Sequence, residues 1–136
     1  MAAGYSGTQL VRKLGIRAGM TCAVLDPPEH YWDLLVDLPD DLTVVDAPGP
    51  GTQFVHVFAR DRKGLAARLR RLRGMISQDG MIWVSWPKKA SGVQTDLTDD
   101  VVREAGLSAG LVDVKVCAVD DTWSGLKFVI PKADRR

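Results

Sequence analysis

Short apolar runs alternate along the chain with stretches of helical periodicity, and this alternation predicts a layered α/β fold. The apolar runs are the expected strands, at residues 20–25, 42–45, 54–59, 81–86, 112–119 and 126–130. Apolar residues in the intervening stretches recur at the three- and four-residue spacing that is typical of helices. Strands that alternate with helices indicate a mostly parallel sheet with helices on both faces, which makes three layers.

Four helices are expected, each with a start or stop signal. The first follows a cap at Ser6 or Thr8 and ends at Gly15, and the second starts at Pro28. The second has an apolar stripe made of Tyr31, Trp32, Leu34, Leu35 and Leu38. The third, capped by Asp61, places four apolar residues on one face: Leu65, Leu69, Leu72 and Ile76. The fourth, capped by Thr98, buries a side made of Val101, Val102, Ala105 and Leu107.

The last two strands are expected to form an antiparallel hairpin. The strand over 112–119 alternates as VDVKVCAV, which is typical of a half-buried strand. The turn over 120–125 then leads into the strand over 126–130. Residues 46–53 are too few for a helix between two parallel strands, so the strand order around this segment stays open.

Length and composition predict one domain over residues 1–136. The N-terminal segment has no apolar signal core, and the longest apolar runs are too short to span a membrane. Cys22 and Cys117 both lie in apolar runs, which favours a reducing compartment over a disulfide framework. We therefore expect a cytoplasmic protein.

Charge is segregated although its sum is only +1. No Lys or Arg lies between Arg17 and Arg60, whereas the next segment is rich in arginine. The near-neutral total, with no aromatic platform among the arginines, argues against nucleic acid as the partner. Self-association to a homo-oligomer, through opposite charges or through Tyr31 and Trp32, remains open.

The candidate ligand site follows the strand over 81–86, where the sequence reads GMIWVSWPKKASG. Loops at the carboxyl ends of parallel strands lie on one edge, where open α/β sheets bind ligands. This edge would hold Trp86, Lys88, Lys89, Ser91 and Trp123. Lysines supply charge for a small anionic ligand, and an indole supplies a stacking face. In the alternative, the two indoles pack in the core and the lysines are solvated.

The histidines and cysteines show no spacing typical of a metal site, so none is expected. His30 follows a Pro-Pro turn and could act as an acid or base, but the sequence indicates no partner for it. His56 lies in the middle of a strand and is expected to fill the interior or an edge. No nucleophile elbow, P-loop or dinucleotide motif is present.

The second half of the chain resembles known families. SQDGMIWVSW, with the helix, strand and hairpin that follow, is similar to the end of class I methyltransferase domains. GMIWVSWPKKASG and DDTWSGLKFVI more closely resemble a family of uncharacterised bacterial proteins. The resemblance implies a compact, degenerate relative of the methyltransferase-type Rossmann sheet, and it implies no activity.

The methyltransferase resemblance would place an S-adenosylmethionine site beside Asp26 and Asp46, but no intact site, and therefore no cofactor, is expected in this chain. Asp46 matches the place of the acidic ribose ligand. However, the turn after the first strand reads LDPPEHY, without glycine and with two prolines that remove amide donors. Three functions stay open: a domain that binds a small anionic ligand, an interaction scaffold, and an atypical S-adenosylmethionine-dependent transferase.

Overall fold

A six-stranded sheet with the order β2-β1-β3-β4-β6-β5 forms the centre of the computed structural model, which describes residues 9–136. The strands are β1 (Thr21–Leu25), β2 (Thr43–Val45), β3 (Phe54–Phe58), β4 (Met81–Pro87), β5 (Val112–Ala118) and β6 (Trp123–Val129). Strands β1 to β4 run parallel, and β6 is antiparallel to both β4 and β5. The predicted α/β fold, with its mostly parallel sheet and C-terminal antiparallel hairpin, is confirmed.

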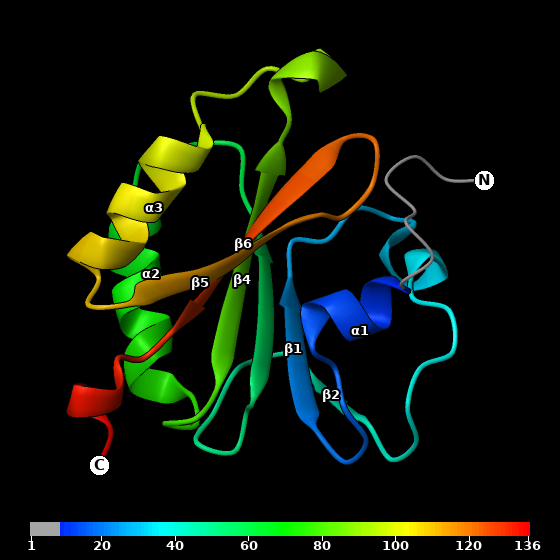
Figure 1. The fold of residues 1–136 in the computed structure, drawn as a ribbon, viewed down its shortest axis with the longest axis vertical. Helices are drawn as coiled ribbons and strands as arrows, with labels where there is room; N and C mark the ends of the chain where they lie inside the picture. The colour runs from blue at the N-terminus through cyan, green and yellow to red at the C-terminus, as the bar shows by residue number, and fades with distance from the viewer. Residues whose placement is uncertain (1–8) are drawn as a thin grey trace.

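Helices lie on both faces of this sheet (Figure 1). The α-helices are α1 (Leu10–Leu14), α2 (Leu65–Met75) and α3 (Asp99–Ser108). Three short 3-10 turns are η1 (Tyr31–Leu34), η2 (Lys89–Ser91) and η3 (Lys132–Asp134). In Figure 1, α2 and α3 lie on one side of the sheet and α1 on the other. None of the helices over residues 9–136 has the length and apolar content that crossing a membrane requires.

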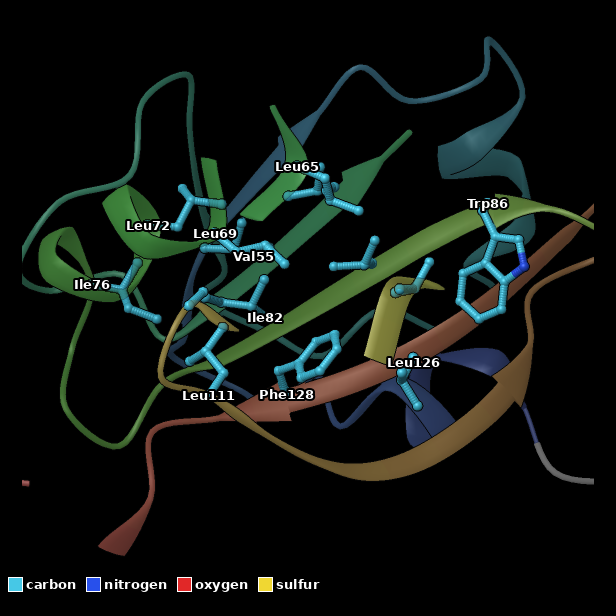
Figure 2. Packing of buried hydrophobic residues seen from close by; sticks show 14 of the residues in the cluster. Val55, Leu65, Leu69, Leu72, Ile76, Ile82, Trp86, Leu111, Leu126 and Phe128 are labelled. Carbon is cyan, nitrogen blue, oxygen red and sulfur yellow. The ribbon is translucent and has the colours of Figure 1, made fainter. Parts of the chain in front are cut away.

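Each face of the sheet has its own apolar core. Figure 2 shows the core under α2, in which Leu65, Leu69 and Leu72 of the helix share one cluster with Val55 and Ile82 of the sheet. The predicted spacing of this helix face is therefore confirmed. The core under α1 collects aromatic and aliphatic side chains: Leu10, Leu14, Tyr31, Phe54, Phe58, Trp83 and Trp123 among them. Alternate residues of β4 supply the two cores in turn, as the pleat of a strand requires.

The helix predicted from Pro28 is wrong, because the chain makes only the 3-10 turn η1 there. Tyr31 is buried, but Trp32 and Leu38 are 39% and 40% exposed and form no buried stripe. Asp37 has a φ of 59°, a left-handed conformation that a continuing α-helix cannot contain. An apolar stripe here was therefore not sufficient evidence for a helix.

The predicted helix starts have mixed outcomes. The Thr98 hydroxyl accepts a hydrogen bond from the Val101 amide, so the predicted cap of α3 is confirmed. Asp61 does not cap α2, which begins after Gly64 in a left-handed conformation with a φ of 76°. Ser6 and Thr8 lie outside the described residues, and the residue before α1 is Gln9.

Two further expectations change in the second half of the chain. Val102 is buried and Val101 and Ala105 pack against the core as predicted, but Leu107 is 52% exposed, and Gly106 completes the buried side of α3. Strand β6 begins at Trp123 rather than at Leu126, because residues from Trp123 onward already pair with β4. The open question around residues 46–53 is answered by β1, which lies between β2 and β3 and pairs with both.

Gly106 allows α3 to pack closely on β6, and a side chain there should destabilise the fold. A Cβ atom at Gly106 would lie 2.1 Å from a ring carbon of Phe128. We expect Gly106→Ala to lower the free energy of unfolding by about 1–3 kcal/mol through overpacking. Gly74→Ala in α2 is the matched control, because no atom lies within 4 Å of its added Cβ. Urea unfolding should find the control neutral or stabilised, since alanine favours helix; equal effects would contradict this packing.

Candidate functional site

The strand order places a topological switch point between β1 and β3. The chain passes from β1 outward to β2 and then returns to β3 on the other side of β1. The loops after β1 and β3 therefore leave the carboxyl edge in different directions. Open α/β sheets bind ligands in the crevice at such a point. This edge is where the sequence predicted a site, but β3 lies between the switch point and β4, whose loop holds most of the predicted residues.

A hollow of about 450 Å³ lies at this switch point. Its lining comes from the ends of β1 and β3, the start of α2 and the start of β6: Asp26, Phe58, Ala59, Arg60, Asp61, Lys63, Arg68 and Trp123. Three cationic side chains thus meet two carboxylates. We call these lining residues the switch-point hollow.

Two contacts organise the cations of the switch-point hollow. The Arg68 guanidinium donates to Asp26 Oδ2 at 3.0 Å, which links α2 to the end of β1. The Arg60 guanidinium lies over the Trp123 ring, 5.5 Å from its centroid. Asp26 has a φ of 55°, a conformation in which Asp is tolerated better than most residues. The carboxyl edge therefore holds one paired arginine and one stacked arginine beside each other.

The N-terminus of α2 adds positive potential to the same region. No side chain caps this helix, and its first turn contains no acidic residue. The contrast with α3 is direct, since α3 has the Thr98 cap and both Asp99 and Asp100 in its first turn. Because a helix N-terminus carries partial positive charge, α2 lacks the compensation that α3 has.

The structure places the two predicted tryptophans on opposite faces of the sheet. Trp86 belongs to the core under α2, whereas Trp123 belongs to the core under α1. Both are only 5% exposed. The Phe58 and Trp123 rings are nearly perpendicular, with a centroid distance of 5.0 Å. A pocket lined by both indoles therefore does not form, and only Trp123 borders the switch-point hollow.

Lys88 and Ser91 have contacts that order the loop after β4. Lys88 Nζ donates to the carbonyl oxygen of Asp120 at 2.6 Å. Ser91 Oγ donates to the Lys88 carbonyl at 2.6 Å and accepts from the Val93 amide at 3.2 Å. Lys89 is exposed. These side chains lie near the carboxyl edge, but they do not line the switch-point hollow.

His30 has a partner that the sequence did not indicate. Its Nε2 lies 2.8 Å from Asp120 Oδ2, although the two residues are 90 positions apart. Asp120 Oδ1 also accepts from the Thr122 and Trp123 amides. Burial opposes ionisation of Asp120, but the hydrogen bonds from His30, Trp123 and Thr122 outweigh it and lower its pKa. The His30–Asp120 pair thereby joins the loop after β1 to the turn before β6.

His56 is fully buried beneath this edge, as predicted. Its Nδ1 lies 2.9 Å from the Tyr31 hydroxyl, and its Nε2 lies 2.7 Å from Ser85 Oγ. Burial lowers the pKa of His56 to about 3 and raises that of Tyr31. The Phe58 ring stacks on the imidazole at 4.3 Å. This neutral network supports the floor of the carboxyl edge and is closed to solvent.

Most arginines of α2 connect elements of the fold. Arg70 donates to the Ser108 carbonyl at 2.7 Å, and Arg73 donates to the Gly110 carbonyl at 3.0 Å. Both contacts satisfy carbonyl groups at the end of α3. The basic segment of the sequence is thus divided, since Arg60, Lys63 and Arg68 line the hollow while later arginines hold α3.

The switch-point hollow lies one loop earlier along the chain than the loop for which the sequence predicted ligand residues. Arg60 and Lys63 directly follow β3, so their position at a strand end was the available signal. Asp46 is exposed after β2 and does not line the switch-point hollow, whereas Asp26 does. Among residues 9–136, no three His, Cys, Asp or Glu side chains converge in a way that could hold a metal ion.

The sequence matches a protein family over residues 38–132, more than half of the chain. The chain belongs to this family, which is described as a protein of unknown function, DUF3052. The predicted membership of an uncharacterised family is therefore confirmed. Comparison with curated proteins finds no match.

Three solved structures with a similar fold are named as methyltransferases. A SAM-dependent methyltransferase from Aquifex aeolicus has a TM-score of 0.66 and 10% identity, over 88% of this chain and 87% of that one. The mitomycin 7-O-methyltransferase MmcR has a TM-score of 0.59 and 8% identity, over 82% of this chain but 49% of its own. Magnesium protoporphyrin IX methyltransferase ChlM from Synechocystis PCC 6803, with bound SAH, has a TM-score of 0.53 and 11% identity. The match covers 89% of this chain and 78% of that one. At such identities the likeness shows a methyltransferase-like fold.

Proposed function

We propose that this domain binds a small anionic ligand in the switch-point hollow. The observation that carries the proposal is the meeting of three cationic side chains with an uncapped helix N-terminus at this point. Arg60, Lys63 and Arg68 supply charge, and the start of α2 supplies amide dipoles that favour an anion. The hydrogen bonds of Lys88 and Ser91 order the loop after β4, which gives this loop a supporting position.

The ion pair between Arg68 and Asp26 is the contact that an incoming anion would have to compete with. Arg68 already donates to Asp26, whose side chain is 70% exposed. An incoming carboxylate or phosphate would compete with Asp26 for the guanidinium, which suits planar, bidentate acceptors. Arg60 is held on Trp123, so its charge is available with little loss of side-chain freedom. We therefore propose a ligand with one or two negative charges.

We propose that S-adenosylmethionine is not this ligand. After β1 the chain has Asp26 in a left-handed conformation followed by Pro27 and Pro28, which have no amide hydrogen to donate. Asp46 lies outside the hollow lining. The sulfonium cation would also meet Arg60, Lys63 and Arg68. These residues do not fit the cofactor, and an atypical transferase remains the outcome that a positive binding test would favour.

A second candidate function is self-association as an interaction scaffold. One observation favours it, a shallow apolar hollow of about 540 Å³ beside the edge strand β2. Its lining is partly exposed: Trp32, Leu38, Pro39, Leu42 and Val44. Exposed apolar patches of this kind can be interfaces. Sedimentation of the wild-type chain and of Val44→Asp would distinguish a dimer through this edge from a monomer.

A thermal-shift screen tests the anion proposal. Candidate ligands are nucleotides, dinucleotides, acyl-CoA, S-adenosylmethionine and S-adenosylhomocysteine. A ligand at about 100 times its dissociation constant adds about 2.7 kcal/mol, which raises the melting temperature by several degrees. We expect an anionic ligand to do this and the double variant Arg60→Gln, Arg68→Gln to lose the gain.

The matched control is Arg71→Gln, an exposed α2 arginine outside the hollow lining. This variant should keep the full ligand-induced rise in melting temperature. Equal rises in the wild type, the double variant and Arg71→Gln would mean that the ligand binds elsewhere. No gain from any anion would contradict the proposal, and a gain from S-adenosylmethionine alone would favour the transferase.

A further inference from the structure

Two lysines face each other directly across the hairpin. Lys115 of β5 and Lys127 of β6 are register partners, so their side chains project from the same face of the sheet. Like charges in directly opposed positions are destabilising. Lys127 is partly buried, and its pKa is lowered first by burial and then by the charges of Lys115 and Arg17. This arrangement opposes folding unless something else compensates for it.

The end of α1 meets the same two lysines. Lys115 Nζ donates to the Lys13 carbonyl at 2.9 Å, and a Cβ at Gly15 would lie 3.9 Å from Lys127 Nζ. Carbonyl groups at a helix C-terminus favour cations, so α1 compensates in part. The helix has only five residues, and the carbonyl takes one of three ammonium protons on Lys115.

Carboxylates do not supply the rest of the compensation. None of the ion pairs among residues 9–136 uses Arg17, Lys115 or Lys127. The ionisable groups that shift the pKa of Lys127 are both cations. The structure thus places Lys115 and Lys127 on the sheet face away from α2 and α3, because Leu126 and Phe128 on either side of Lys127 point into the core under α2. Arg17 follows α1 in the chain. We call Arg17, Lys115 and Lys127 the α1 basic cluster.

We propose that the α1 basic cluster is a second anion site, separate from the switch-point hollow, that takes a phosphate group. Phosphate carries more than one negative charge and accepts hydrogen bonds from several directions. It can therefore pair with cations from β5, from β6 and from the segment after α1 at the same time. Lysine binds phosphate as a point charge and needs no planar acceptor. Two sources supply such a group: inorganic phosphate or polyphosphate, and the phosphate chain of a nucleotide.

The test measures thermal unfolding with tripolyphosphate, inorganic phosphate or ADP, each against sodium chloride of equal ionic strength. Without phosphate, Lys127→Gln should melt no lower than wild type, because it relieves like-charge repulsion. With tripolyphosphate, its affinity should fall about tenfold, as expected for one lost charge-assisted contact. Lys132→Gln, at the exposed C-terminal turn, is the matched control and should behave as wild type.

The double variant Arg60→Gln, Arg68→Gln distinguishes the two proposed sites. Its melting temperature should still rise with tripolyphosphate. Loss of the gain there, with retention in Lys127→Gln, would overturn the proposal and assign phosphate to the hollow. A gain from ADP but not from tripolyphosphate would identify a nucleotide as the source. A salt-sensitive dimer that Lys127→Gln dissociates, with no phosphate effect, would also overturn it and indicate an acidic surface of a second copy.

Discussion

Replacing Trp83 with alanine is expected to lower the free energy of unfolding by about 3–5 kcal/mol, the typical cost for a buried large aromatic. Trp83 lies in the middle of β4 with no exposed surface. Its indole nitrogen donates to the Leu14 carbonyl at 2.8 Å, which fixes the end of α1 on the sheet. Gly125 of the neighbouring strand leaves room for the ring, since a Cβ there would lie 3.2 Å from it.

Two losses add together in this variant. Removing the ring opens a cavity in the core under α1, and the Leu14 carbonyl loses its buried donor. Chemical denaturation followed by circular dichroism measures the change. Trp32→Ala is the control, because Trp32 is 39% exposed and should contribute far less. A loss at Trp83 of less than about 1 kcal/mol would contradict the packing of α1.

Acidification from pH 7 to pH 5 is expected to remove about 2 kcal/mol of stability through His56 alone. The unfolded residue titrates near its ordinary value of 6.5, whereas burial lowers its pKa in the folded protein to about 3. Between these values only the unfolded chain binds the proton. The stability from neutral His56 is therefore complete above pH 6.5 and is lost progressively as pH falls toward 3.

Urea unfolding from pH 7 to pH 4.5 tests this expectation in the wild type and in His56→Gln. The variant should show a shallower decline with falling pH, since it lacks the titrating group. Should the variant fail to fold, NMR titration of the wild type gives the answer directly. The His56 ring signals should stay unchanged to below pH 5, and titration of His56 near pH 6.5 would contradict its burial.

The regular parts of the fold were predictable because local pattern and burial agree in them. The α2 face made by Leu65, Leu69 and Leu72 is an example, since its helical spacing matches its contact with the sheet. The segment after Pro28 failed for the opposite reason. Its apolar residues have helical spacing, but Asp37 adopts a left-handed backbone, and burial of Tyr31 is decided by His56 in a distant strand.

The candidate site shows the same limit. The sequence predicted a site at the carboxyl edge, but it could not show which loops share a hollow there. The strand order decides this, because β1 and β3 are neighbours and bring Asp26 to Arg68. The pleat decides the rest, because Trp86 and Trp123 point to opposite faces. The His30–Asp120 contact likewise joins loops whose proximity no local spacing encodes.

The most direct test of the proposed anion site is NMR of the tryptophan indole N–H groups during titration with AMP, which carries at most two negative charges. The Trp123 signal should shift with AMP concentration, since Trp123 borders the switch-point hollow and supports Arg60. The Trp86 signal, from the opposite face of the sheet, should stay in place. A shift of Trp86 with Trp123 unchanged, or saturation with neither signal moving, would contradict an anion site at the switch point.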